Sequence, residues 1–165
     1  MKKLKYTATR VFNWTSVVTT NIDYTHEVLK KGNPSWKPHQ ISDVKIGDVV
    51  LSYDLDKHNI VDAKVVGRVE ESLSEPAETF EFETLNKKLK LTTYHSLPYY
   101  RDDKLIEDSV STLEVGDKVI SVDSDLNVEF TEVTDVKKEI TNNDTVYHPR
   151  ISNDYYFVNR VLIHD

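Results

Sequence analysis

The sequence VKIGDVVLSYD at residues 44–54 returns as LEVGDKVISVD at residues 113–123. The second stretch lies 69 residues after the first, because residue 113 aligns with residue 44. In each copy a Gly-Asp pair precedes alternating apolar and polar residues, a pattern typical of a tight turn that leads into a half-buried strand. The repeat therefore predicts two similar β units within one chain.

The similarity between the two halves continues downstream of these turns. The alignment pairs residues 59–71 with 127–139, residues 78–80 with 144–146, and His95 with His164. Any β protein can repeat a Gly-Asp turn, because Gly supplies a positive φ and Asp caps the turn. A shared turn alone does not explain the matching strands and the paired histidines. We therefore expect one pseudo-twofold domain that arose by duplication.

Short strands dominate the rest of the sequence pattern. Stretches rich in Val, Ile, Thr, Phe and Tyr with a period of two occur at residues 44–54, 60–71, 78–84, 87–93, 117–123, 127–136 and 145–151. Gly, Pro, Asn and Asp mark the breaks between them. Only residues 24–31 and 105–113 have a briefly helical pattern. The sequence predicts an all-β domain of ten or more strands.

Composition limits the function classes. The chain has 165 residues, which suits one domain, and its net charge of −7 comes from interleaved acidic and basic residues. No basic face favours nucleic acid, and no apolar run is long enough to span a membrane. We expect a monomer in the cytoplasm that binds neither nucleic acid nor membrane.

The chain contains no cysteine, so a thiol nucleophile, a disulfide and a thiolate metal site are all excluded. Any covalent chemistry must use a hydroxyl group. His26, His39 and His58 are scattered in polar turns without carboxylates at ligand spacing. We expect no metal and no cofactor.

Duplicated β halves that begin near a Gly-Asp turn resemble the Hint fold, which inteins share with hedgehog autoprocessing domains. The segments that carry the resemblance are ISDVKIGDVVLS at 41–52, LKLTTYHSLP at 89–98, VY at 146–147, YFVN at 156–159 and VLIHD at 161–165. Their order and spacing are similar to those of the intein blocks. The resemblance implies a horseshoe-like Hint domain over residues 16–165, with residues 1–15 as a flanking extein or leader.

The resemblance also implies self-processing chemistry at the start of the domain. An intein begins with a hydroxyl or thiol that attacks the preceding backbone carbonyl, which converts an amide into an ester by an N–O acyl shift. Ser16 is the nucleophile that the resemblance suggests, with His95 as the acid that protonates the amide nitrogen and Thr92 as a hydrogen-bonding partner. The neighbouring hydroxyl-rich run leaves rivals for the nucleophile, namely Thr15, Thr19 and Thr20.

At the other end, the resemblance assigns His164 to the last step of splicing. There the family cyclises a terminal Asn, but this chain has Asp165. With a reference pKa of about 3.9, the protonated carboxyl needed for ring closure would be scarce at neutral pH. We therefore expect Asp165 to stall release, either as a natural slow variant or as a substitution. Splicing in the family also uses a +1 residue, which accepts the upstream segment by transesterification, and this sequence does not include it.

Two further positions depart from the family pattern. His148 stands where the family often has Asp, and Tyr155 stands where it often has His. Both side chains can donate or shuttle protons, so both are candidate catalytic residues. The competing interpretation is that each simply packs in the core or on the surface.

The resemblance predicts a single-turnover protein-splicing element rather than a turnover enzyme. Its partners would be the flanking extein polypeptides, and a complementary split fragment is an alternative that the sequence leaves open. A phage DNA polymerase is the host suggested by cysteine-free inteins of this size, in the cytoplasm of an infected or bacterial cell. Two other functions remain open: a Hint autocleavage domain that does not splice, and a non-catalytic β-rich binding module.

Overall fold

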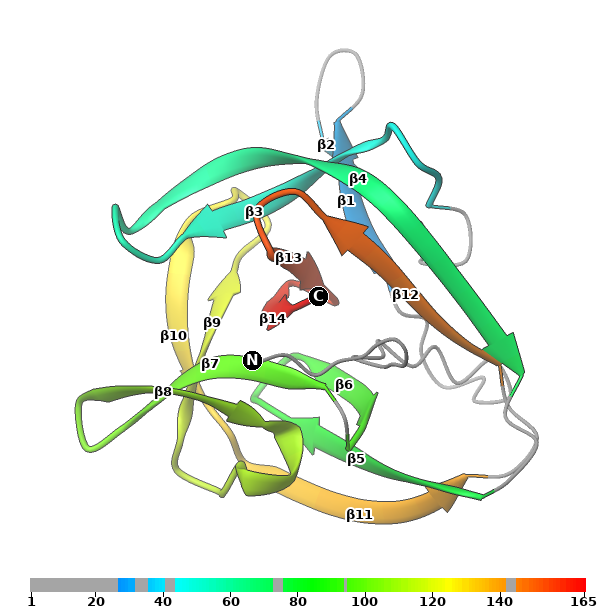
Figure 1. The fold of residues 1–165 in the computed structure, drawn as a ribbon. Helices are drawn as coiled ribbons and strands as arrows, with labels where there is room; N and C mark the ends of the chain where they lie inside the picture. The colour runs from blue at the N-terminus through cyan, green and yellow to red at the C-terminus, as the bar shows by residue number, and fades with distance from the viewer. Residues whose placement is uncertain (1–26, 32–35, 41–43, 73–75, 94, 142–144) are drawn as a thin grey trace.

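The computed structural model describes residues 27–31, 36–40, 44–72, 76–93, 95–141 and 145–165. In these ranges the chain is almost entirely β-structure (Figure 1), as the sequence predicts. The strands are β1 Glu27–Lys31, β2 Trp36–Gln40, β3 Val49–Asp54, β4 Asn59–Ser72, β5 Ala77–Glu83, β6 Lys88–Thr92, β7 Ser96–Arg101, β8 Lys104–Ser109, β9 Lys118–Val122, β10 Val128–Glu132, β11 Asp135–Thr141, β12 Thr145–Ile151, β13 Tyr155–Val158 and β14 Val161–His164. A 3-10 helix spans Val110–Thr112.

The two Gly-Asp turns have the same local structure, as the sequence repeat predicts. Gly47 and Gly116 have φ values of 95° and 99°, a region that favours glycine. The Gly47 N–H donates to the carbonyl of Val65 at 2.8 Å, and the Gly116 N–H donates to that of Val133 at 2.9 Å. In both turns the aspartate also accepts a hydrogen bond from the backbone N–H three residues earlier.

The two halves exchange strands. In the first half β3 pairs with β4, and in the second β9 pairs with β10 in the same way. Beyond this point β4 continues and pairs with β12 from the second half. In return β11 from the second half pairs with β5 from the first. Each half is therefore completed by the other.

An eleven-stranded sheet connects the two candidate histidine motifs. Its order is β12-β4-β3-β1-β13-β14-β9-β7-β8, with β2 beside β1 and β10 beside β9. Strand β9 joins the two motifs, because it pairs with β7 at Lys118 and Val119 and with β14 at Ser121. Strands β7 and β14 also contact each other. A second sheet has the order β11-β5-β6.

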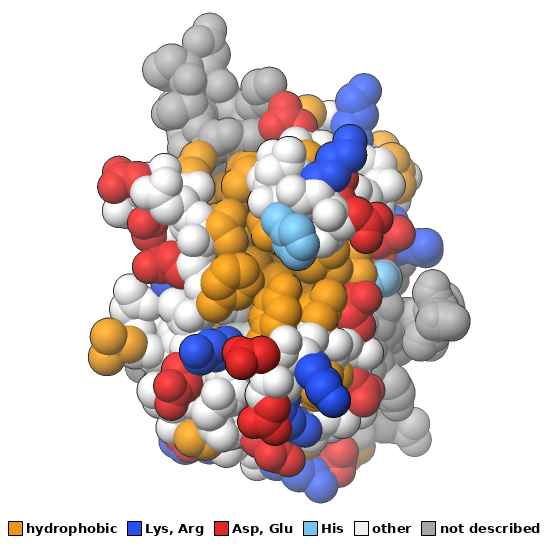
Figure 2. Space-filling view, turned by 90° about the vertical axis from the view of Figure 1, so that its left-hand side faces the viewer, with side chains coloured by type: hydrophobic (Ala, Val, Ile, Leu, Met, Phe, Trp, Pro, Cys, Tyr) orange, Lys and Arg blue, Asp and Glu red, His pale blue; other side chains and the backbone are white. Residues whose placement is uncertain are grey.

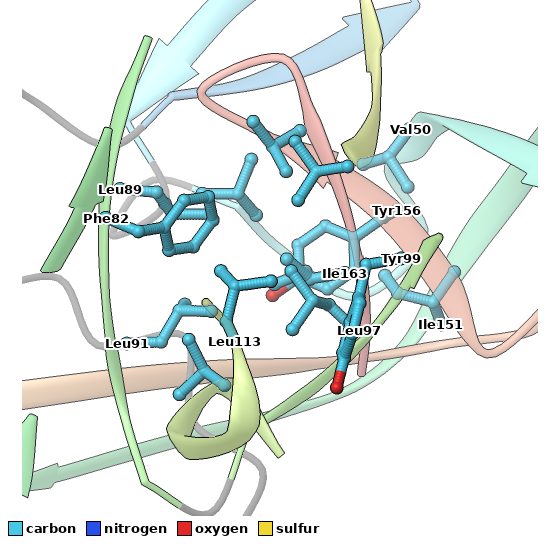
Figure 3. Close-up of a cluster of buried hydrophobic side chains, with 14 of the residues drawn as sticks. Val50, Phe82, Leu89, Leu91, Leu97, Tyr99, Leu113, Ile151, Tyr156 and Ile163 are labelled. Atoms are coloured by element: carbon cyan, nitrogen blue, oxygen red, sulfur yellow. The ribbon is translucent and has the colours of Figure 1, made fainter. Parts of the chain in front are cut away.

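Alternation along the strands produces two cores. The main cluster fills the space between the two sheets, where Phe82, Leu89 and Leu91 face Tyr156 and Ile163 (Figure 3). The second cluster lies on the other face of the large sheet and contains Leu29, Leu51, Tyr53, Ile120, Val122, Phe157 and Leu162. Partly buried side chains among the described residues pack against it, and Figure 2 shows hydrophobic side chains gathered on the face that carries β9 and β10.

The two short helical expectations are wrong over the described residues. Residues 27–31 form β1, and most of residues 105–113 form the end of β8, followed by the 3-10 helix. Pairing with β13 and β2, and with β7, overrides the weak local periodicity. The predicted strand 127–136 also divides into β10 and β11, because the chain crosses from one sheet to the other at Val133 and Thr134. No helix in the described residues is long and apolar enough to cross a membrane.

Candidate functional site

Thr92 is the last residue of β6, and His95 immediately precedes β7 across a short turn. The His95 N–H donates to the Thr92 carbonyl at 3.0 Å, and the His95 carbonyl accepts from the Val110 N–H at 2.8 Å. Both side chains are buried. The Ser109 hydroxyl donates to the Thr93 carbonyl at 2.6 Å and holds the turn against the end of β8. The backbone of the turn is thus held on both sides, and the His95 imidazole is fully buried.

Tyr155, His164 and Asp165 form a second group at the end of the β13–β14 hairpin. Tyr155 and His164 are register partners across the hairpin, so their side chains lie on the same face of the sheet. Their rings meet edge to face, with centroids 4.9 Å apart and an interplanar angle of 73°. The Nδ1 atom of His164 lies 2.9 Å from the backbone oxygen of Asp165 and 3.5 Å from its Oδ1.

The Asp165 side-chain carboxyl is buried and accepts a hydrogen bond from one backbone N–H. Its Oδ2 accepts a 2.6 Å hydrogen bond from the Ile151 N–H, and its own N–H donates to the Asp154 carbonyl at 2.7 Å. Arg150 Nε lies 3.9 Å from the same Oδ2. The Ile151 bond forms at a β-bulge where the register of β12 against β4 shifts between Arg150 and Ile151. Bulges commonly redirect backbone groups in this way beside functional sites.

Burial raises the pKa of Asp165 to about 6, even though the Ile151 N–H and the charges of His164 and Arg150 oppose the rise. The expectation that this carboxyl keeps its reference pKa is therefore wrong. Sequence alone could not show this, because the pKa depends on how deeply the fold buries the side chain. At pH 7 about a tenth of the carboxyls are protonated rather than about a thousandth.

Tyr155 connects the hairpin to the other half of the molecule. Its hydroxyl donates to the Glu107 carboxylate on β8, and its backbone carbonyl accepts from the Ser52 hydroxyl at 2.6 Å. Burial, followed by the bond to Glu107, raises the pKa of the Tyr155 phenol. The hydroxyl therefore remains a protonated donor at neutral pH.

The remaining candidates lie partly or wholly outside the described residues. Ser16 and its rivals Thr15, Thr19 and Thr20 fall in residues 1–26, so their positions relative to His95 stay a prediction. His148 lies on β12, where its backbone pairs with Val69, three residues before the Ile151 that binds Asp165. Its side chain is not among those described.

The fold places the group of Thr92 and His95 and the group of Tyr155, His164 and Asp165 beside two strands that contact each other. His95 immediately precedes β7 and His164 ends β14, and these strands contact each other beside β9. A histidine such as His95 can donate a proton to one peptide bond, and the pair of His164 and Asp165 can act on a second peptide bond of the same chain. Among the described side chains, no group of three or more His, Cys, Asp or Glu is placed to hold a metal ion.

Sequence reasoning missed the residues that support the Tyr155 group. Glu107, Ser52 and Ile151 contact it from three different strands. Ser52 carries one available signal, since it occupies the same position in the first repeat as Ser121 in the second, and both are fully buried. Glu107 and the Ile151 N–H have no local signal, because their roles depend on strand register.

Comparison with solved structures identifies the fold. An intein-like domain from Clostridium thermocellum is 24% identical, with a TM-score of 0.65 over 85% of this chain and 94% of that one. The PabCDC21-1 intein is 19% identical, with a TM-score of 0.72 over 91% and 98%. A DnaB intein from Synechocystis sp. PCC 6803 is 12% identical, with a TM-score of 0.66 over 85% and 98%. The chain therefore has the Hint fold of inteins. No protein-family profile and no curated protein matches the sequence.

Proposed function

We propose that this chain is a protein-splicing domain that acts once on its own flanking peptide bonds. The Hint fold supports this function, as do the paired positions of His95 and His164 at the ends of contacting strands. The observation that carries the proposal is the buried Asp165 carboxyl, which lies beside His164 and accepts the Ile151 N–H. A buried carboxyl with a raised pKa at a chain position next to a histidine is typical of a catalytic group rather than of a structural one.

The first proposed step is an N–O acyl shift at Ser16. The Ser16 hydroxyl oxygen bonds to the carbonyl carbon of Thr15, and the bond from that carbon to the Ser16 nitrogen breaks. The hydroxyl proton leaves and a proton is delivered to the departing nitrogen, so an ester and a free amine result. His95 is the proposed proton donor, and Thr92 is proposed to hydrogen-bond the same peptide.

The last proposed step releases a segment joined after Asp165. The protonated side-chain carboxyl attacks the backbone carbonyl carbon of Asp165, and the bond to the next nitrogen breaks. The product is a five-membered cyclic anhydride, and the carboxyl proton ends on the departing amine. His164 is the proposed group that polarises the carbonyl that would be attacked, because its Nδ1 lies 2.9 Å from the Asp165 backbone oxygen. The raised pKa predicts that Asp165 slows release but does not abolish it.

The proposed substrates are the flanking extein peptides, with a +1 hydroxyl or thiol residue that accepts the upstream segment by transesterification. A split origin, a phage DNA polymerase host and a cytoplasmic setting remain proposals from the resemblance. A Hint domain that cleaves without splicing would use the first step alone, and would not need Asp165 beside His164. A non-catalytic binding module would need neither group.

Intact mass spectrometry before and after neutral hydroxylamine tests the first step. An ester at Thr15–Ser16 would be cut, releasing residues 1–15 from the parent but not from Ser16→Ala. The sequence contains no Asn-Gly, which is the usual background site for this reagent. Cleavage at a different residue would move the nucleophile to Thr15, Thr19 or Thr20. Absence of cleavage in both proteins would contradict the acyl shift and favour the binding module.

A further inference from the structure

We infer that Glu107 is a positioning residue for His164, acting through Tyr155. This inference rests on the proposed splicing function, because it assigns Glu107 to the C-terminal step. Glu107 lies on β8, in a hairpin whose sequence carries none of the candidate site residues. The Tyr155 side chain links Glu107 to His164, because it contacts both residues.

The Tyr155 ring is the part that touches His164. Because the two residues are directly opposite in the β13–β14 hairpin, the rings pack at 4.9 Å on one face of the sheet. The imidazole is about a quarter exposed, and it is in contact with the Tyr155 ring on one side and with the Asp165 backbone oxygen through Nδ1. A movement of the Tyr155 ring would leave the His164 ring free to turn away from the Asp165 carbonyl.

Among the described residues, the hydroxyl of Tyr155 forms its hydrogen bond with a residue of another strand, Glu107 on β8. The Ser52 hydroxyl fixes the Tyr155 backbone, and Asn153 Nδ2 in turn donates to Ser52 at 2.9 Å. Neither contact restrains the phenol ring about its own side-chain bonds. The restraint at the far end is the hydrogen bond to Glu107, a charge-assisted bond of the stronger kind.

An open cavity lies beside Tyr155 and Glu107, so the hydrogen bond between them affects where the Tyr155 ring can lie. The cavity has a volume of about 340 Å³ and is lined by Tyr53, Asp54, Leu55 and Asn153, with Tyr155 and Glu107 at one side. The Tyr155 ring packs against the second hydrophobic cluster and also borders this open space, so it is not enclosed on all sides. Without the bond to Glu107, the ring therefore has room to shift relative to His164.

NMR of the chain as it exists tests the contact directly, through the ring proton shifts of His164. In Glu107→Ala we expect these shifts to move toward those of an exposed histidine, because the aromatic neighbour departs. Tyr155→Phe, which removes the same hydrogen bond from the other side, should move them as well. Glu107→Gln keeps an acceptor oxygen and should retain most of the parent shifts. Glu132→Ala removes an exposed carboxylate from β10 and is the matched control.

Kinetics of a chain extended by a reporter peptide after Asp165 test the consequence. We expect Glu107→Ala to slow release of the reporter about tenfold, the scale of one hydrogen bond to a charged group. Tyr155→Phe should have a similar effect, and the double variant should be no slower than either single variant, because both break one link.

The outcomes separate the two proposals. Parental His164 shifts in both Glu107→Ala and Tyr155→Phe, or rate losses that multiply in the double variant, would overturn the role of Glu107. An extended parent that never releases its reporter would contradict the proposed function, while the NMR comparison would still decide whether Glu107 positions His164. If Glu107→Ala does not fold, Tyr155→Phe and Glu107→Gln decide the question.

Discussion

Oδ2 of Asp165 accepts a 2.6 Å hydrogen bond from the backbone N–H of Ile151, at the bulge where β12 shifts its register against β4. This bond holds a buried carboxyl whose pKa is raised to about 6 beside the peptide bond that it is proposed to attack. The donor comes from a strand that belongs to the second half of the repeat but pairs with the first half. The geometry of the C-terminal step thus depends on strand exchange.

Release of a segment joined after Asp165 should be faster at lower pH. The reactive form is the protonated carboxyl, so the rate should rise about tenfold from pH 8 to pH 7 and level off below about pH 6. Mass spectrometry of a chain extended beyond Asp165 would measure it. Asp165→Asn is the control, since a carboxamide does not titrate and should release faster at pH 7. A rate that increases with pH would contradict the anhydride step.

The free energy of unfolding should depend on pH because of the same Asp165 carboxyl. Its pKa in the folded state, about 6, lies above the ordinary value of 3.8. The folded state therefore binds the proton more tightly, and the stability from this group is lost as pH rises through about 6. Between pH 5 and pH 7.5 we expect the parent to lose about 1 kcal/mol relative to Asp165→Asn. Urea unfolding of both proteins at the two pH values would show it, and a constant difference would refute it.

Each of the two equivalent glycines should be needed for its own turn. Gly47 and Gly116 have φ values of 95° and 99°, and no atom lies within 4 Å of an added Cβ, so strain rather than crowding determines the cost. We expect Gly47→Ala and Gly116→Ala to lower the free energy of unfolding by about 1 to 3 kcal/mol each. The preceding exposed residues supply controls, Ile46→Ala and Val115→Ala, which should change little. Chemical denaturation measures all four, and a negligible loss in either glycine variant would mean that its turn relaxes.

His95 should govern the N-terminal step but not the C-terminal one. Replacing a general acid usually costs a factor of 10² to 10⁴ in rate, so His95→Ala should slow the hydroxylamine release of residues 1–15 by about a hundredfold or more. His58→Asn is the control, because His58 is exposed on the β3–β4 turn at φ 56° and Asn tolerates that conformation. Equal cleavage in the parent and in His95→Ala would remove His95 from the first step.

The electrostatics of the second turn illustrate what local sequence can and cannot predict. The Asp117 carboxylate caps its own turn through the Glu114 N–H, as the Gly-Asp pattern indicates. It also accepts two 2.8 Å hydrogen bonds from Arg101, which lies at the end of β7. Although burial opposes it, these bonds lower the pKa of Asp117. The cap follows from sequence spacing, but the Arg101 contact follows from the pairing of β7 with β9.

Strand formation was predictable where alternation and turn residues agreed, as in β3, β4 and β9. It was not predictable for β1 and β8, whose short sequences have no clear period and become strands only by pairing with neighbours. The candidate residues Thr92, His95, His164, Asp165 and Tyr155 could be selected from sequence by the repeat and the resemblance. Their grouping could not, because contacts such as Tyr155 with Glu107 join residues that are far apart in the chain.

The all-β class, the repeat and the two Gly-Asp turns follow from the amino-acid sequence, because they depend on residue spacing over a few positions. The exchange of β4 and β11 between the halves, and the contact between β7 and β14, are visible only in the folded molecule. The tertiary structure also decides the protonation of Asp165, since burial and not residue type raises its pKa. The physical reason is common to all three: strand register and burial are properties of the assembled sheet, to which residues from both halves contribute.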